Sequence, residues 1–267
     1  IACLIVFIPW SFIEPSNERD WDQDFAETGT VEVEGDVITF INYRDFDYTK
    51  NASGEWMTTP DWTNKTVHLS KLRGMDIFHD RFLGNIMAHP ILSFDFGEDG
   101  RVCLSIETRR EKGETFSPLG GLYKMFELQY IFTAETDAVR VRTNLREEPV
   151  FLYKSALSME EVRYLFLSSV VVQNQLAESP QFYNIVNANC TTSIRNQIPT
   201  SERSPFDLRM LVNGLLDQYL YEKGVLVSEG LSFSELSEAC RINEVAAAAH
   251  SDPNFSEVIR EGRPGQE

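Results

Sequence analysis

The first half of the chain alternates apolar and polar residues with the period of two that is typical of β-strands. Residues 31–48 alternate on both sides of a Gly-Asp pair, which predicts a hairpin. Residues 50–64 contain Gly, Pro, Asn and two tryptophans, and we expect them to form an exposed loop. Residues 122–133 and 138–153 predict two further strands, joined by the polar turn AETD. The first half is therefore expected to form an antiparallel sheet.

One strand pair brings polar side chains together. Two strand-like arms, residues 85–96 and 101–111, flank the turn sequence GEDG. Pairing across this turn places His89 opposite Glu107 or its neighbour. Side chains alternate between the two faces of a strand, so Ser105 shares the face of Glu107, one rung away.

The second half has helical periodicity. Ser158 and Glu161 form a capping box before a long apolar run. A second helix is predicted over residues 208–223, with Leu208 and Leu215 among the apolar residues on its core face. A run of small residues, EVAAAAHSD, predicts a further helix near the end. The fold class is therefore expected to be α+β, an antiparallel sheet followed by helices.

A cysteine at a predicted helix start is the strongest chemical signal. The apolar stretch YNIV leads into NANC and a helix that ends before a proline. Asn189 is a favourable N-cap, which makes Cys190 the first helical residue. The helix dipole and the free backbone N–H groups there favour a thiolate and could hold an acyl oxyanion. The segment alone leaves open a small buried cysteine under an ordinary cap. The residues that we consider for substrate or oxyanion binding are Asn189, Thr191, Tyr183 and Ser105.

A thiolate nucleophile needs a base, which is usually histidine. Of the four histidines, His89 lies in a well-defined strand with Glu107 predicted across the hairpin, as a catalytic base requires. His79 is flanked by acidic residues and is expected at the surface. The alternatives are a hydrogen-bonded core histidine at 89 and a Glu107 that pairs with a neighbouring arginine. The sequence contains no HxH, HxxH or HExxH spacing and no Gly-rich phosphate loop, so we expect neither a metal nor a cofactor.

Composition and charge exclude several classes of function. A hydrophobic content of 42% and an aromatic content of 12% are typical of a globular protein with a real core. The net charge of -17 argues against nucleic-acid binding and against binding to anionic lipid through a polybasic segment. None of the four cysteines forms a CxxC pair, which disfavours a zinc ribbon or a thioredoxin-type site. The sequence leaves open whether two of the cysteines form a disulfide.

The opening ten residues, IACLIVFIPW, are apolar and uncharged. We interpret them as the remnant of a membrane segment, although a full span needs about 20 apolar residues. The alternatives are the apolar region of a signal peptide, a lipoprotein signal ending at Cys3, and a buried strand.

Several blocks resemble the Lnb N-terminal periplasmic domain family of bacteria: AHPILSFDF, SIETRREKGETFS, FELQYIF, VRVRTNLRE and above all YNIVNANCTTSIR. The resemblance runs from about Pro15 to the C-terminus. The family is similar to circularly permuted papain-like enzymes of the NlpC and lecithin:retinol acyltransferase group. In that group the histidine strand precedes the cysteine helix, as His89 precedes Cys190 here. The resemblance thus implies Cys190 as nucleophile, His89 as base and Glu107 as the third polar residue.

The resemblance also implies a function and a domain organisation. The namesake of the family is associated with N-acylation of lipoproteins in Bacteroidota, which implies a thiol acyltransferase or hydrolase at the periplasmic face of the inner membrane. The suspected partner is an acyl lipid or a lipoprotein. A cysteine peptidase or amidase of cell-wall peptides and a catalytically silent binding domain are the alternatives. We expect a membrane-anchor remnant and linker at 1–14, the permuted papain-like catalytic domain at 15–200, and a helical extension packed on it at 201–267.

Overall fold

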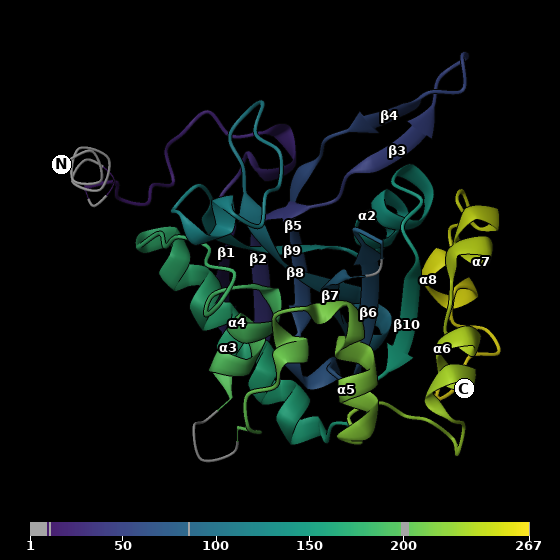
Figure 1. The fold of residues 1–267 in the computed structure, drawn as a ribbon. Coiled ribbons are helices and arrows are strands. Elements are labelled where there is room, and N and C mark those ends of the chain that lie inside the picture. The colour runs from purple at the N-terminus through teal and green to yellow at the C-terminus, as the bar shows by residue number, and fades with distance from the viewer. Residues whose placement is uncertain (1–9, 11, 85, 199–202, 267) are drawn as a thin grey trace.

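A mostly antiparallel sheet forms the centre of the molecule and is followed by helices, as predicted (Figure 1). The structure is a computed structural model, and it describes residues 10, 12–84, 86–198 and 203–266. The strand order is β1-β2-β9-β8-β7-β6-β10, with β5 paired to β2, and β2 runs parallel to β9. The strands of the sheet are β1 (Thr30–Glu34), β2 (Val37–Arg44), β5 (Trp62–His68), β6 (Gly74–Phe82), β7 (Met87–Asp95), β8 (Arg101–Arg109), β9 (Glu127–Ala134) and β10 (Val150–Lys154).

Helices cover both faces of the sheet. On one face, the ring of Phe166 in α3 packs against the rings of Phe40, Phe94 and Phe132. Figure 1 shows α6, α7 and α8 as a column beside β10. The opposite face carries Ile91, which is buried under α2, α7 and α8. The helices are α2 (Glu135–Arg140), α3 (Met159–Glu178), α4 (Cys190–Gln197), α5 (Leu216–Glu222), α6 (Phe233–Ala239), α7 (Asn243–Ala248) and α8 (Phe255–Val258).

The β7–β8 hairpin has the predicted register. Ile91 lies opposite Ser105. Continued by two residues, backward along β7 and forward along β8, the same register brings His89 opposite Glu107. On its other side His89 pairs with Asp80 of β6. The hairpin therefore places three titratable side chains at one end of the sheet.

The prediction of a strand over residues 138–153 is wrong in its first part. The chain forms α2 there, then a π-helical turn at Val141–Leu145, and becomes extended only at β10. The acidic sequence AETD is the first turn of α2 and not a turn between strands, because acidic side chains stabilise a helix N-terminus. Ala138 and Val139 are both buried in the apolar cluster that packs on the sheet.

Two further segments differ from the sequence interpretation. Residues 50–64 contain β4 (Trp56–Thr59), which pairs with β3 (Asp47–Lys50), and the start of β5, so they are not a loop. The predicted helix over 208–223 is helical as α5 only from Leu216. Before that it is broken into two short 3₁₀ turns around an Asn-Gly pair, which favours turns over helix. Leu208 is consequently exposed instead of packed in the core, and so is Leu215.

The helix starts at α3 and α4 confirm the sequence signals. Ser158 and Glu161 form both hydrogen bonds of a capping box at the start of α3.

Cys103, Cys190 and Cys240 are free thiols. None of the helices in the described residues has the length and apolar character needed to span a bilayer. The membrane-segment interpretation concerns residues that lie outside the described ones, apart from Trp10.

Candidate active site

Cys190 is the first residue of α4, and its helix start is tightly capped. The side chain of Asn189 accepts a hydrogen bond from the Thr192 N–H at 2.7 Å, and the Thr192 hydroxyl accepts one from the Asn189 N–H at 3.0 Å. The cap leaves the N–H groups of Cys190 and Thr191 without an intrahelical acceptor. The Cys190 side chain, 6% exposed, therefore lies beside the positive end of a helix.

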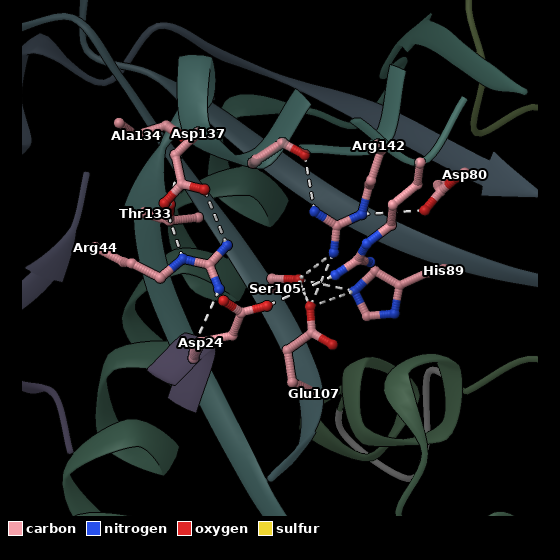
Figure 2. Close-up of polar contacts among 12 residues, drawn as sticks. Asp24, Arg44, Asp80, His89, Ser105, Glu107, Thr133, Ala134, Asp137 and Arg142 are labelled. Atoms are coloured by element: carbon pink, nitrogen blue, oxygen red, sulfur yellow. Dashed lines mark hydrogen bonds and ion pairs between the residues drawn. The ribbon is translucent and has the colours of Figure 1, made fainter. Parts of the chain in front are cut away.

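His89 is held by a short chain of hydrogen bonds (Figure 2). Its Nε2 lies 2.7 Å from Ser105 Oγ and 3.3 Å from Glu107 Oε1. Ser105 Oγ in turn donates to Glu107 Oε1 at 2.6 Å. Burial alone would lower the pKa of His89, but the Glu107 charge and a hydrogen bond with Cys190 outweigh it and raise this pKa from 6.5 to about 9. Since Nε2 faces Ser105 and Glu107, Nδ1 is the ring nitrogen left to exchange a proton with the thiol.

Arg142 fixes the carboxylate behind the histidine. Its guanidinium donates to Glu107 Oε1 at 2.9 Å and to the Ala138 carbonyl at 2.8 Å, and its Nε lies 3.1 Å from Asp80 Oδ2 (Figure 2). Burial raises the pKa of Glu107, but His89 and Arg142 together hold it well below its usual 4.5. Glu107 thus stays ionised beside His89. The sequence predicts this partner for His89 but not the contribution of Arg142.

Asn213 brings a second polar group to the thiol. Its side-chain Nδ2 lies 3.5 Å from Cys190 Sγ, while its Oδ1 accepts a hydrogen bond from the Ala88 N–H at 2.8 Å. The acceptor end of the amide is therefore engaged with β7, and the donor end faces the sulfur. Together with the Cys190 N–H at the helix start, this amide places a second hydrogen-bond donor near the sulfur, and an oxyanion hole requires such donors.

A buried pair of polar side chains, His79 and Asp217, contacts the backbone of Asn213. His79 Nδ1 lies 3.0 Å from Asp217 Oδ2, and His79 Nε2 donates to the Asn213 carbonyl at 3.1 Å. Asp217 also accepts hydrogen bonds from Arg81 and from the Tyr153 hydroxyl. The prediction that His79 lies at the surface is wrong, because its side chain is 1% exposed. The acids next to it in sequence are buried with their own arginine partners, Arg142 for Asp80 and Arg260 for Asp76.

A cavity of about 440 Å³ opens in front of Cys190 and His89. Its lining contains the apolar or aromatic residues Phe82, Leu83, Met87, Phe116 and Tyr183. It also contains the charged residues Arg44, Asp80, Glu107, Arg142 and Arg146. Such a cavity suits a ligand with an apolar part next to a polar part.

The structure separates the four residues that the sequence suggested for substrate or oxyanion binding. Among the described residues, Tyr183 is the one of these four that lines the cavity. Ser105 is fully buried and acts on His89. Asn189 is occupied by the cap and by the Ile185 carbonyl, and Thr191 is buried. No group of three or more His, Cys, Asp or Glu side chains within the described ranges could hold a metal ion.

Sequence reasoning missed Asn213 and Arg142. The signal for Asn213 was present, since an Asn-Gly pair inside an apolar run marks a break in the helix. Arg142 was placed in a strand, where its side chain could not be related to His89. In the structure the π-helical turn directs it onto Glu107, and such turns are frequent at functional sites.

Comparison with known proteins gives one match. The sequence model of the Lnb N-terminal periplasmic domain family matches residues 58–214. No curated protein and no solved structure matches the chain. The matched range is more than half of the 267 residues and runs from before His89 to just after Asn213. The chain therefore belongs to the Lnb N-terminal periplasmic domain family.

Proposed function

We propose that this periplasmic domain is a cysteine-dependent acyltransferase or hydrolase with Cys190 as nucleophile and His89 as acid and base. The single observation that carries the proposal is His89 held between Cys190 and the ionised Glu107, in a cavity that contains all three side chains. A nucleophile, a base and a group that orients the base make up the usual unit of thiol catalysis. The order of histidine strand before cysteine helix supports a circularly permuted papain-like arrangement.

The first half of the reaction forms a thioester. With a pKa of about 9, His89 is protonated at neutral pH, and a cation beside a thiol at a helix start favours the thiolate. The Cys190 thiolate attacks the acyl carbonyl carbon, and the oxyanion is held by the Cys190 N–H and the Asn213 amide. The carbonyl re-forms as the bond to the leaving group breaks, and His89 gives its proton to that group.

The second half returns the enzyme to its starting state. Neutral His89 accepts a proton from an incoming amine or water, which attacks the thioester carbonyl. The Cys190 thiolate leaves, and the acyl group passes to the acceptor. Glu107 stabilises the imidazolium at both ends of the cycle, because its carboxylate lies 3.3 Å from Nε2.

The lining of the cavity supports an acyl substrate over a cell-wall peptide. Phe82, Met87 and Phe116 line the same cavity as Cys190, and their apolar side chains suit a hydrocarbon chain. The acyl donor proposed here is an acyl lipid or a lipoprotein, at the periplasmic face of the inner membrane. A peptidase or amidase and a catalytically silent binding domain are the outcomes that the experiment separates from it.

The test measures acyl turnover with p-nitrophenyl esters of increasing chain length and with a peptide anilide. We expect ester turnover that improves with chain length and a Cys190 acyl adduct in the intact-protein mass. Cys190→Ala and His89→Ala should each lose at least about a thousandfold in kcat, and the double variant should be no worse, because the two side chains act as one unit.

Two matched substitutions control for the loss of a histidine or a thiol as such. His68→Ala removes a partly exposed histidine that pairs with Asp99, and Cys240→Ala removes a buried thiol at the C-terminal end of α6. Both should retain turnover. Full activity in either Cys190→Ala or His89→Ala would refute the proposed mechanism. Faster cleavage of the anilide than of every ester would favour the peptidase, and no turnover of any substrate would favour the binding domain.

A further inference from the structure

Four chain segments contribute residues to the lining of the cavity. They are the β6–β7 turn, the loop after β8, the loop before α4 and the 3₁₀ turns before α5. The first contributes Leu83, and the others contribute Phe116, Tyr183 and Asn213. Neighbouring segments contact one another, since the Gly214 N–H donates to the Ile86 carbonyl at 3.1 Å and the Ile185 N–H donates to the Gly121 carbonyl at 3.1 Å. The four segments therefore lie next to one another at the cavity that contains Cys190.

Every one of these segments also exposes large apolar side chains to solvent. We define the apolar rim as Leu83, Ile86, Leu119, Tyr123, Val186 and Val212. Ile86, Leu119 and Tyr123 are 62%, 68% and 63% exposed. Single exposed apolar residues are ordinary, but a cluster of them around one opening marks an interaction surface. The rim residues thus belong to the same four segments that contribute to the cavity lining.

The N-terminal part of the chain lies against the same rim. The indole of Trp10 donates to the Tyr123 carbonyl at 2.9 Å, and the Lys124 ammonium donates to the Ile13 carbonyl at 3.0 Å. Phe12, between them, is exposed. The nine residues that precede Trp10 in the sequence, IACLIVFIP, carry no charge. An apolar sequence therefore joins the fold beside the rim, with a tryptophan of the kind that is enriched at membrane interfaces.

We propose that the apolar rim docks on the surface of a phospholipid bilayer, with the opening of the Cys190 cavity facing the lipid. A bilayer is favoured over a folded partner because the rim consists of separate side chains on four loops, and because Trp10, whose indole bonds to the Tyr123 carbonyl, is of a residue type enriched at membrane interfaces. That an acyl chain of a lipid would enter the cavity and contact its apolar lining rests on the proposed function. The docking itself rests on the exposed side chains alone.

The test follows the alkylation of Cys190 by iodoacetamide with and without phosphatidylcholine vesicles, using the full chain. A zwitterionic lipid is chosen because the net charge of -17 opposes an anionic surface. Docking covers the opening, so vesicles should slow the labelling of Cys190 in the unaltered protein. In a rim variant with Ile86→Ser, Leu119→Ser and Tyr123→Ser, this protection should be lost. Each large side chain that leaves water is worth about a tenfold factor in affinity, so three should weaken docking at least about a hundredfold.

A matched control variant carries Val33→Ser, Met57→Ser and Val171→Ser, three exposed apolar residues on β1, β4 and α3. It should keep the protection. Residues 1–9 are present in all forms, so any anchoring by them is equal. Circular dichroism checks folding, and Ile86→Ser alone should give partial loss of protection if the triple variant does not fold.

Several results would overturn the docking. One is an unchanged rate of Cys190 labelling when vesicles are added, and another is equal protection of the rim and control variants. A third is a dimer that forms without lipid and is lost in the rim variant, which would assign the rim to a second copy of the chain. Protection without acyl turnover would retain the docking and reject the proposed function instead.

Discussion

Glu107→Gln should remove the charge that keeps His89 protonated, while leaving a side chain of almost the same shape. In the unaltered protein Glu107 and the Cys190 hydrogen bond raise the pKa of His89 from 6.5 to about 9 despite burial. At 1.36 kcal/mol for each pH unit, that rise corresponds to about 3 kcal/mol in favour of the protonated form. Burial stays in the variant and the charge that opposes it is gone, so the pKa of His89 should fall below 9.

The same interaction makes stability depend on pH. The raised pKa of His89 gives a contribution that is fully present below 6.5 and is lost as the pH rises through about 9. The lowered pKa of Glu107 gives one that is present above 4.5 and lost as the pH falls through its folded value. Stabilisation by the pair is therefore complete only between pH 4.5 and 6.5, and Glu107→Gln should flatten the decline above 6.5.

The assay is an NMR titration of the histidine ring signals, with the His89 signal assigned by its loss in His89→Gln. Urea unfolding at pH 6 and at pH 9 then measures the stability difference. Asp99→Asn is the matched control. The Asp99 carboxylate lies 2.7 Å from His68 Nδ1, and neither residue lines the cavity. The substitution should leave the His89 titration unchanged. A His89 midpoint in Glu107→Gln equal to that of the unaltered protein would refute the electrostatic reasoning.

Three further predictions concern the thiols and the two asparagines. Iodoacetamide should label Cys190 before Cys103 and Cys240, because burial raises the thiol pKa of Cys103 well above 9 and that of Cys240 to about 12; peptide mapping reads the order, and equal rates contradict it. Asn213→Ala should lower kcat for acyl turnover about a hundredfold to a thousandfold as an oxyanion donor is lost, with an unchanged circular dichroism spectrum. Asn189→Ala should lower the free energy of unfolding by about 1 kcal/mol in urea, and no change would contradict the cap.

The sequence by itself located the three residues proposed to act in catalysis because each depends on local structure. Cys190 follows an asparagine cap, and capping depends on residues within one helical turn. His89 and Glu107 face each other because a short turn sets the register of its hairpin. The α+β class and the start of α3 at its capping box are local in the same sense.

Tertiary structure decided what surrounds those residues. Asn213 reaches the thiol from a segment that the sequence assigned to a separate extension beyond residue 200, and Arg142 reaches Glu107 from a segment that was expected to be a strand. His79 is buried beside Asp217, a partner that lies 138 positions further along the chain. Periodicity and turn signals report interactions within about ten residues, whereas the burial of a charge depends on which distant groups the fold brings to it. The sequence therefore located the proposed nucleophile, the proposed base, and the helix and hairpin that carry them. Only the packing of distant segments decided which charged groups surround His89, where the Asn213 amide lies and which residues line the cavity.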